Sequence, residues 1–219
     1  MTNDLQAAYD ECLRIAHAHY ENFPVASWLV PARLRIHVAA IYNFARRADD
    51  LADEGDDKVQ TRLDALAAMG RSLDTCLQGT TADDYLFLAL GNTVREHQLD
   101  PQLLNDLLSA FSQDVTQTRY QDFAEVLDYC RRSANPVGRL MLQLFGEASA
   151  QNNQDSDKIC SALQLINFLQ DIQQDLVEND RVYFPLDEMQ AANVSVDELR
   201  ANSQQPHVVS FVHQQTRRA

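Results

Sequence analysis

The stretch AAIYNFARRADDLADEG, residues 39–55, combines an amphipathic helical pattern with acidic side chains at the edge of its apolar face. Apolar residues recur every three or four positions, which predicts a helix from Pro31 to Asp53 that stops at Gly55. Asp49 and Asp53 are four residues apart, so they lie above one another on the rim of the buried face. Acidic groups are costly in such a position unless a cation accompanies them.

A second acidic helix is predicted over residues 158–178 and contains the sequence LQLINFLQDIQQDL, residues 163–176. Its polar residues recur at helical spacing and form one strip, bordered by Phe168 and other large hydrophobic residues. The strip consists of Gln164, Asn167, Asp171 and Asp175. A polar strip between large hydrophobic side chains is typical of a cavity wall.

The two acidic sets together predict a Mg²⁺ site. Two carboxylates about 6 Å apart repel by about 3 kcal/mol at an effective dielectric constant of about 20. Mg²⁺ offsets such repulsion, and it binds through one or two carboxylates, waters and phosphate oxygens. The predicted ligands are Asp49, Asp50, Asp53, Asn167, Asp171 and Asp175, with Asp50 pointing further towards solvent. The alternative is a solvated acidic face neutralised by Arg46 and Arg47.

The length suits one domain or two small ones, of which we expect a single domain, and the composition favours an all-α fold. The chain has 219 residues, only six glycines and a net charge of −14. Low glycine content disfavours an all-β fold, and the negative field disfavours nucleic acid as a partner. Further helices are predicted at residues 4–19, 58–78, 82–97, 101–111, 123–146, 195–201 and 206–218, with a kink at Pro136 and a polar linker at 149–157.

Several other chemistries lack their sequence signatures. The four cysteines are far apart with no CxxC pair, so we expect reduced thiols, with Cys130 packed in the core rather than acting as a nucleophile. The sequence contains neither the Glu-x-x-His pairs of di-iron bundles nor His-Glu-x-x-His, so we expect core or surface histidines rather than a zinc site. Glycine-rich nucleotide loops are also missing.

Four segments, in order, resemble the squalene/phytoene synthase family of head-to-head isoprenoid synthases. They are NFPVASWLVP (22–31), residues 39–55, YCRRSANPVG (129–138) and QLINFLQDIQQDLVENDRVYFP (164–185). The forms of NFPVAS and YCRRSANPVG are most similar to family members of the bacterial hopanoid pathway.

The resemblance implies an isoprenoid synthase fold whose helices surround a central cavity, with two aspartate motifs facing each other across it. It implies catalytic roles for Asp49, Asp53, Asp171, Asp175 and Tyr129. Arg46 would help to hold diphosphate. Gln164 and Asn167 would bind substrate beside the second motif, and Phe23, Tyr42, Tyr129 and Tyr183 would line the cavity.

The activity implied is Mg²⁺-dependent conversion of presqualene diphosphate to hydroxysqualene, with release of pyrophosphate. Many relatives carry Ser-Lys before the aromatic residue that matches Phe23, where this chain has Tyr20, Glu21 and Asn22. That departure disfavours farnesyl diphosphate condensation. Two alternatives remain: a head-to-head prenyl transferase that makes presqualene diphosphate, squalene or phytoene, and a non-catalytic helical assembly protein with the same fold.

The expected partners are an isoprenyl diphosphate, either presqualene or farnesyl diphosphate, and other hopanoid-pathway enzymes. No stretch reaches the roughly 18 apolar residues of a spanning helix, so the expected location is cytoplasmic, with peripheral contact at the inner membrane face. Relatives continue for further C-terminal helices, so we expect the domain of residues 1–219 to lack them.

Overall fold

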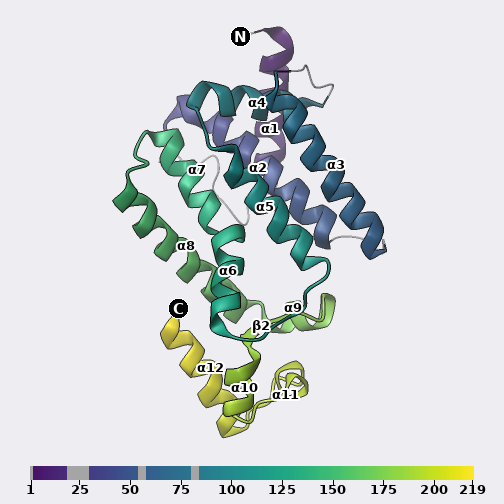
Figure 1. The fold of residues 1–219 in the computed structure, drawn as a ribbon, viewed down its shortest axis with the longest axis vertical. Coiled ribbons are helices and arrows are strands. Elements are labelled where there is room, and N and C mark those ends of the chain that lie inside the picture. Colours follow the sequence, from purple (N-terminus) through teal and green to yellow (C-terminus); the bar gives the residue numbers. More distant parts are fainter. Residues whose placement is uncertain (1, 19–29, 54–57, 80–83) are drawn as a thin grey trace. The chain divides into compact units, whose positions relative to one another are not determined.

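The computed structural model describes residues 2–18, 30–53, 58–79 and 84–219, and it is almost entirely helical (Figure 1). The all-α prediction is therefore confirmed. The chain divides into two compact units, Met1–Val115 with Leu140–Ala148, and Thr116–Arg139 with Ser149–Ala219. Within the described ranges, no helix is long and apolar enough to cross a membrane.

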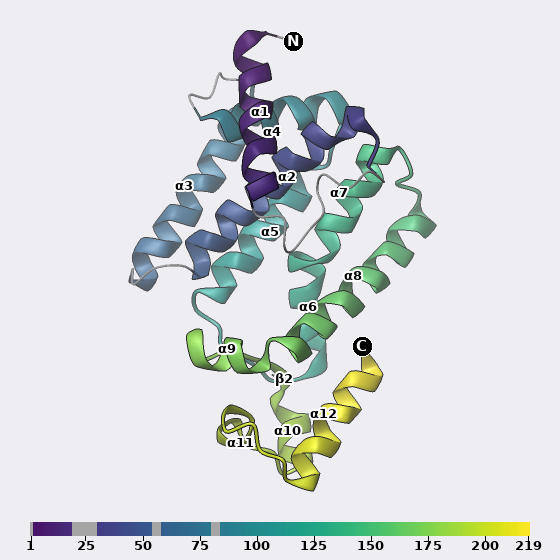
Figure 2. The same cartoon turned by 180° about the vertical axis from the view of Figure 1, so that it is seen from behind.

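The first unit contains the five N-terminal helices, and α1 packs along both α2 and α4 (Figure 2). Their bounds are α1 Asn3–Ala18, α2 Ala32–Asp53, α3 Val59–Leu77, α4 Tyr85–His97 and α5 Pro101–Asp114. Side chains cap α4 and α5: Asp84 accepts a hydrogen bond from the Leu86 amide, and Asp100 accepts one from the Gln102 amide, both at 2.9 Å. These local signals explain why the predicted helices form close to their expected bounds.

The second unit contains a short parallel strand pair and the C-terminal helices. Its elements are β1 Arg119–Tyr120, α6 Phe123–Ser133, the start of α7 Asn135–Phe145, α8 Ala150–Gln170, α9 Ile172–Glu178, β2 Val182–Pro185, α10 Leu186–Ala191, α11 Val196–Arg200 and α12 Pro206–Arg218. A hydrophobic cluster holds α9, β2 and α10–α12 together; it comprises Leu176, Val182, Phe184, Met189, Val194, Leu199, Val208 and Phe211.

The predicted kink before Pro136 is confirmed. The helix ends at Ser133, Ala134 has φ −109° and ψ −48°, and α7 begins at Asn135. Proline fits the first turn of the new helix because amide groups there lack intrahelical acceptors.

The predicted linker at residues 149–157 is wrong, because most of it is helical. Ser149 caps α8 by accepting a hydrogen bond from the Asn152 amide at 3.1 Å. Gln151 donates to Asp155 at 2.9 Å, one turn further on. A cap and an i, i+4 side-chain pair therefore stabilise a segment whose polarity resembles that of a loop.

Gly138 on α7 is a point of close approach to α8. A Cβ there would lie 2.3 Å from Ser156 Oγ and 2.6 Å from Cys160 Sγ. We expect Gly138→Ala to lower the free energy of unfolding by about 1–2 kcal/mol, because overpacking outweighs the gain in helix propensity. Denaturant titration of the purified variant measures this change.

Gly70→Ala on α3 is the matched control, because the nearest atom to its new Cβ would be Leu108 Cδ1 at 3.7 Å. This substitution should stabilise the protein by about 0.5–1 kcal/mol. Replacing Ser156 and Cys160 with alanine should relieve the Gly138→Ala clash. Equal stabilities for the two glycine variants would contradict the close approach.

Candidate functional site

The first aspartate motif lies at the C-terminal end of α2. Asp49, Asp50 and Asp53 are half-buried, and the intervening Ala48 and Ala52 are fully buried. Asp49 and Asp53 therefore lie on the rim of the apolar face, as the spacing predicted. The expectation that Asp50 is the more exposed is wrong: its side chain is 37% exposed against 42% for Asp49.

An ion pair with Arg46 explains why the Asp50 side chain is less exposed than expected. Its Nε lies 2.7 Å from Asp50 Oδ1, and its Nη1 lies 3.7 Å from Asp49 Oδ2. Arg47, the next residue, pairs instead with Asp84. Arg46 thus places a guanidinium beside two of the three carboxylates.

Tyr42 lies one turn before Arg46 and within the field of this motif. Burial raises the pKa of its hydroxyl, Arg46 opposes that rise, and Asp50 and Asp49 add to it. The phenol is therefore a neutral hydrogen-bond donor at neutral pH.

The second acidic set crosses a break between two helices rather than lying on one straight helix. α8 ends at Gln170, and Asp171 has φ −101° and ψ 12° before α9 begins. Backbone bonds still connect successive members: the Asp171 amide donates to Asn167 O at 2.9 Å, and the Asp175 amide donates to Asp171 O at 2.8 Å. Asn167 and Asp171 are exposed, whereas Gln164 and Asp175 are half-buried.

An aromatic cluster, defined as Tyr120, Tyr129, Phe168 and Tyr183, lies beside this acidic set. The rings of Phe168 and Tyr183 stack with centroids 3.9 Å apart and planes 7° apart. Tyr129 contacts both, at 6.1 Å from Phe168 and 5.4 Å from Tyr183. All four rings are buried. Tyr129 and Tyr183 are thus brought together, as a shared cavity wall would require.

A void of about 10 Å³, the size of one water molecule, lies between Asp175 and two of these rings. Its walls include Asp175, Phe168, Tyr183 and the buried Arg181. The Arg181 amide also donates to Asp175 O at 3.0 Å. This backbone hydrogen bond holds Arg181 and Asp175 next to each other at one end of the acidic set.

Sequence reasoning assigned no role to Arg181, Tyr120 or Phe168. Arg181 lies in the segment NDRVYFP, residues 179–185. The helical periodicity is interrupted there, but this interruption does not indicate a role for the arginine. Tyr120 lies in a separate segment and reaches the cluster only because β1 pairs with β2. Phe168 was recognised as a border residue, and its stacking on Tyr183 depends on the same strand.

The predicted site residues fall into two groups. Tyr42, Arg46, Asp49, Asp50 and Asp53 lie in the first unit, and Tyr129, Gln164, Asn167, Asp171, Asp175 and Tyr183 lie in the second. Phe23 lies outside the described residues. The convergence of the two groups on a central cavity stays a prediction.

Cys130 is a packed thiol rather than an activated one. Its side chain is fully buried, and burial raises its pKa to about 12. A thiol that stays protonated at neutral pH is a poor nucleophile.

The donors of both acidic sets suit a hard cation. They are carboxylate oxygens and, at Asn167, an amide oxygen, the ligand types that Mg²⁺ prefers. Among the residues that the structure describes, neither set by itself brings three acidic or histidine ligand atoms together. Mg²⁺ needs few protein ligands, because water and phosphate oxygens complete its coordination. Small sets of carboxylates such as these are therefore suited to it.

Comparisons with known proteins identify the family. Residues 16–219 match the squalene/phytoene synthase family. The chain is 43% identical over 192 residues to hydroxysqualene synthase of Rhodopseudomonas palustris, covering 85% of this chain and 62% of that protein. It is 40% identical over 184 residues to hydroxysqualene synthase of Sinorhizobium fredii, covering 83% of this chain and 60% of that protein.

A solved structure, squalene synthase HpnC from Alicyclobacillus acidocaldarius, matches with a TM-score of 0.90 at 33% identity, covering 100% of this chain and 81% of that one. The chain belongs to the squalene/phytoene synthase family. It spans about 60% of the length of the curated relatives it matches.

Proposed function

We propose that this protein is a hydroxysqualene synthase that converts presqualene diphosphate and water to hydroxysqualene and pyrophosphate. The observation that carries the proposal is that Asp175 and Arg181 border the same small void as the stacked rings of Phe168 and Tyr183. Such a site pairs diphosphate-binding groups with aromatic rings. The hydroxysqualene synthases at 40–43% identity support this choice of reaction within the family.

The reaction begins with heterolysis of the bond between carbon and the diphosphate oxygen, whose electrons leave with pyrophosphate. The cyclopropylcarbinyl cation rearranges, water adds to it, and loss of one proton gives the C30 alcohol. No reductant is consumed.

Asp49, Asp50, Asp53, Asn167, Asp171 and Asp175 would hold Mg²⁺. Bound there, the ion would neutralise diphosphate charge and make pyrophosphate a better leaving group. The other contributions come from the chain itself. Arg46, already poised over Asp49 and Asp50, would donate to diphosphate oxygens, and Tyr42 would add a neutral hydroxyl donor.

The aromatic cluster would stabilise the carbocation. An aromatic face contributes about 0.5–2 kcal/mol to a desolvated cation within about 6 Å of its centroid. Tyr129 and Tyr183 supply such rings, and the apolar wall formed with Phe168 would limit the access of bulk water. Arg181, which borders the same void as Asp175, would help to balance the negative charge of that carboxylate.

The test is incubation of the purified protein with presqualene diphosphate and Mg²⁺, followed by product extraction and chromatography. We expect release of pyrophosphate and an equal amount of hydroxysqualene. Pyrophosphate without a C30 alcohol would rule out this reaction. Formation of presqualene diphosphate, squalene or phytoene from farnesyl or geranylgeranyl diphosphate would instead establish the prenyl transferase alternative. Absence of turnover with every substrate would favour the assembly protein.

The proposal includes a cytoplasmic location with peripheral contact at the inner membrane face. An apolar C30 substrate and product partition into lipid, so exchange at the membrane surface would be favoured. Other hopanoid-pathway enzymes, which would consume the alcohol, are the corresponding protein partners.

A further inference from the structure

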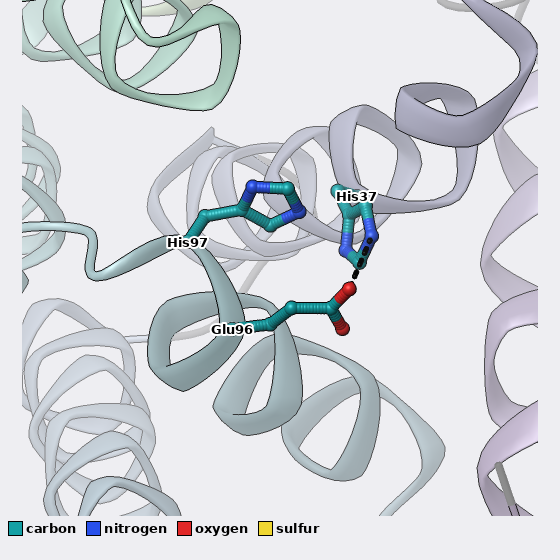
Figure 3. A group of neighbouring side chains, drawn as sticks. All are labelled: His37, Glu96 and His97. Carbon is teal, nitrogen blue, oxygen red and sulfur yellow. Dashed lines mark ion pairs between the residues drawn. The ribbon is translucent and has the colours of Figure 1, made fainter.

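Two histidines and a glutamate converge in the first unit, away from the aspartate motif. His37 lies on α2, and Glu96 and His97 are the last two residues of α4 (Figure 3). One ligand atom from each lies within 4.8 Å of the other two. The sequence spacing predicted no zinc site, because His37 and His97 are 60 positions apart and meet only through the packing of α2 against α4.

The three side chains face a common point, as Figure 3 shows. His37 Nε2 lies 3.9 Å from Glu96 Oε1. The rings of His37 and His97 are 4.3 Å apart at 72°. The geometry thus places two imidazoles edge to face with one carboxylate beside them.

A hydrogen-bond network orients His37. Its Nδ1 lies 3.2 Å from Tyr9 Oη and 3.0 Å from Thr93 Oγ1, and these two hydroxyls are 2.9 Å apart. All three groups are buried. A hydrogen bond at one imidazole nitrogen sets the tautomer and directs the other nitrogen towards a ligand, which is how metal-binding histidines are held.

Glu96 is oriented in a similar way. Asn92 donates to Glu96 Oε2 at 3.0 Å, which leaves Oε1 directed towards His37. The Glu96 side chain is 53% exposed, so it can rotate by the small amount that coordination requires.

The second, independent observation is at His97. Its Nε2 is buried and has no hydrogen-bond partner in the part of the chain that the structure describes. Burying a ring nitrogen without a hydrogen-bond partner costs free energy, and coordination to a metal ion would supply the missing partner.

We propose that His37, Glu96 and His97 bind one Zn²⁺ ion. Two imidazole nitrogens and one carboxylate oxygen are a typical zinc donor set, with water as the fourth ligand. Bonds of about 2.0–2.1 Å require the ligand atoms to approach one another more closely than they do now. The exposed Glu96 allows this movement. The ion would join α2 to the end of α4 and is independent of the proposed Mg²⁺ chemistry.

The experiment is isothermal titration of Zn²⁺ alone into tag-free protein, with Co²⁺ absorption as a second readout. We expect one ion per chain, visible bands typical of tetrahedral Co²⁺, and a higher melting temperature with Zn²⁺. His97→Ala and Glu96→Gln should each weaken binding by at least about 10-fold, since even second-layer groups at metal sites contribute that much.

His207→Ala is the matched control, because His207 also pairs with a glutamate, Glu198, at 2.9 Å, and belongs to no three-ligand group within the described ranges. It should bind Zn²⁺ like the unmodified protein. His37 is not substituted, because its loss would remove the hydrogen bonds that the imidazole makes with the buried hydroxyls of Tyr9 and Thr93. Equal affinity in His97→Ala, Glu96→Gln and the unmodified protein would overturn the proposal, as would absence of saturable binding by folded protein.

Discussion

Asp49→Asn and Asp175→Asn should each reduce pyrophosphate release from presqualene diphosphate by about 10²–10³-fold. Each change removes one negative charge from a set of oxygen ligands and leaves the shape of the side chain almost unaltered. The expected loss corresponds to the several kcal/mol of charge stabilisation that a metal ion supplies to a leaving group. Initial rates at saturating Mg²⁺ measure it.

The same variants should fold normally, because both side chains are half-buried rather than enclosed in the core. We expect their free energies of unfolding to remain within about 0.5 kcal/mol of the unmodified value. Mg²⁺ with pyrophosphate should raise the melting temperature of the unmodified protein, and each variant should lose that rise.

Asp64→Asn is the matched control for this pair. Asp64 lies on α3, is exposed, and accepts a hydrogen bond from Gln60 at 2.9 Å. It should keep full activity and the full response to Mg²⁺ with pyrophosphate. If Asp49→Asn and Asp175→Asn behaved like Asp64→Asn, the two acidic sets would be solvated surface groups and the proposed chemistry would fail.

Phe168→Ala should lower the free energy of unfolding by about 3–5 kcal/mol. Phe168 is 6% exposed, and its ring stacks on Tyr183 at 3.9 Å. Truncation removes this stacking and enlarges the two small cavities that already border the residue. At about 2–4 °C per kcal/mol for a chain of this size, the melting temperature should fall by roughly 6–20 °C. Calorimetry measures both quantities.

Ile159→Ala on the same helix serves as its control, since Ile159 is 61% exposed. It should change stability by no more than about 0.5 kcal/mol. Phe168→Leu should recover much of the loss because it retains most of the apolar volume. A cost below about 1 kcal/mol for Phe168→Ala would show that the aromatic cluster is not part of the packed core.

The sequence by itself determined the all-α class and the approximate positions of most helices. Pro101 marks a helix start, and Pro136 marks the break between α6 and α7. These features depend on hydrogen bonds between residues a few positions apart, so neighbouring residues are enough to set them. The acidic residues at the end of α2 were likewise predictable, because helical spacing alone places them on the rim of a buried face.

Only the tertiary structure decided which distant residues meet. β1 pairs with β2 across about 60 positions and brings Tyr120 to Tyr183; α4 packs beside α2 and brings His97 to His37. The break at Asp171 also escaped prediction, since helical periodicity continues through it. Contacts of this kind depend on how whole elements pack to bury apolar surface, and a spacing pattern within one segment contains no information about its partner.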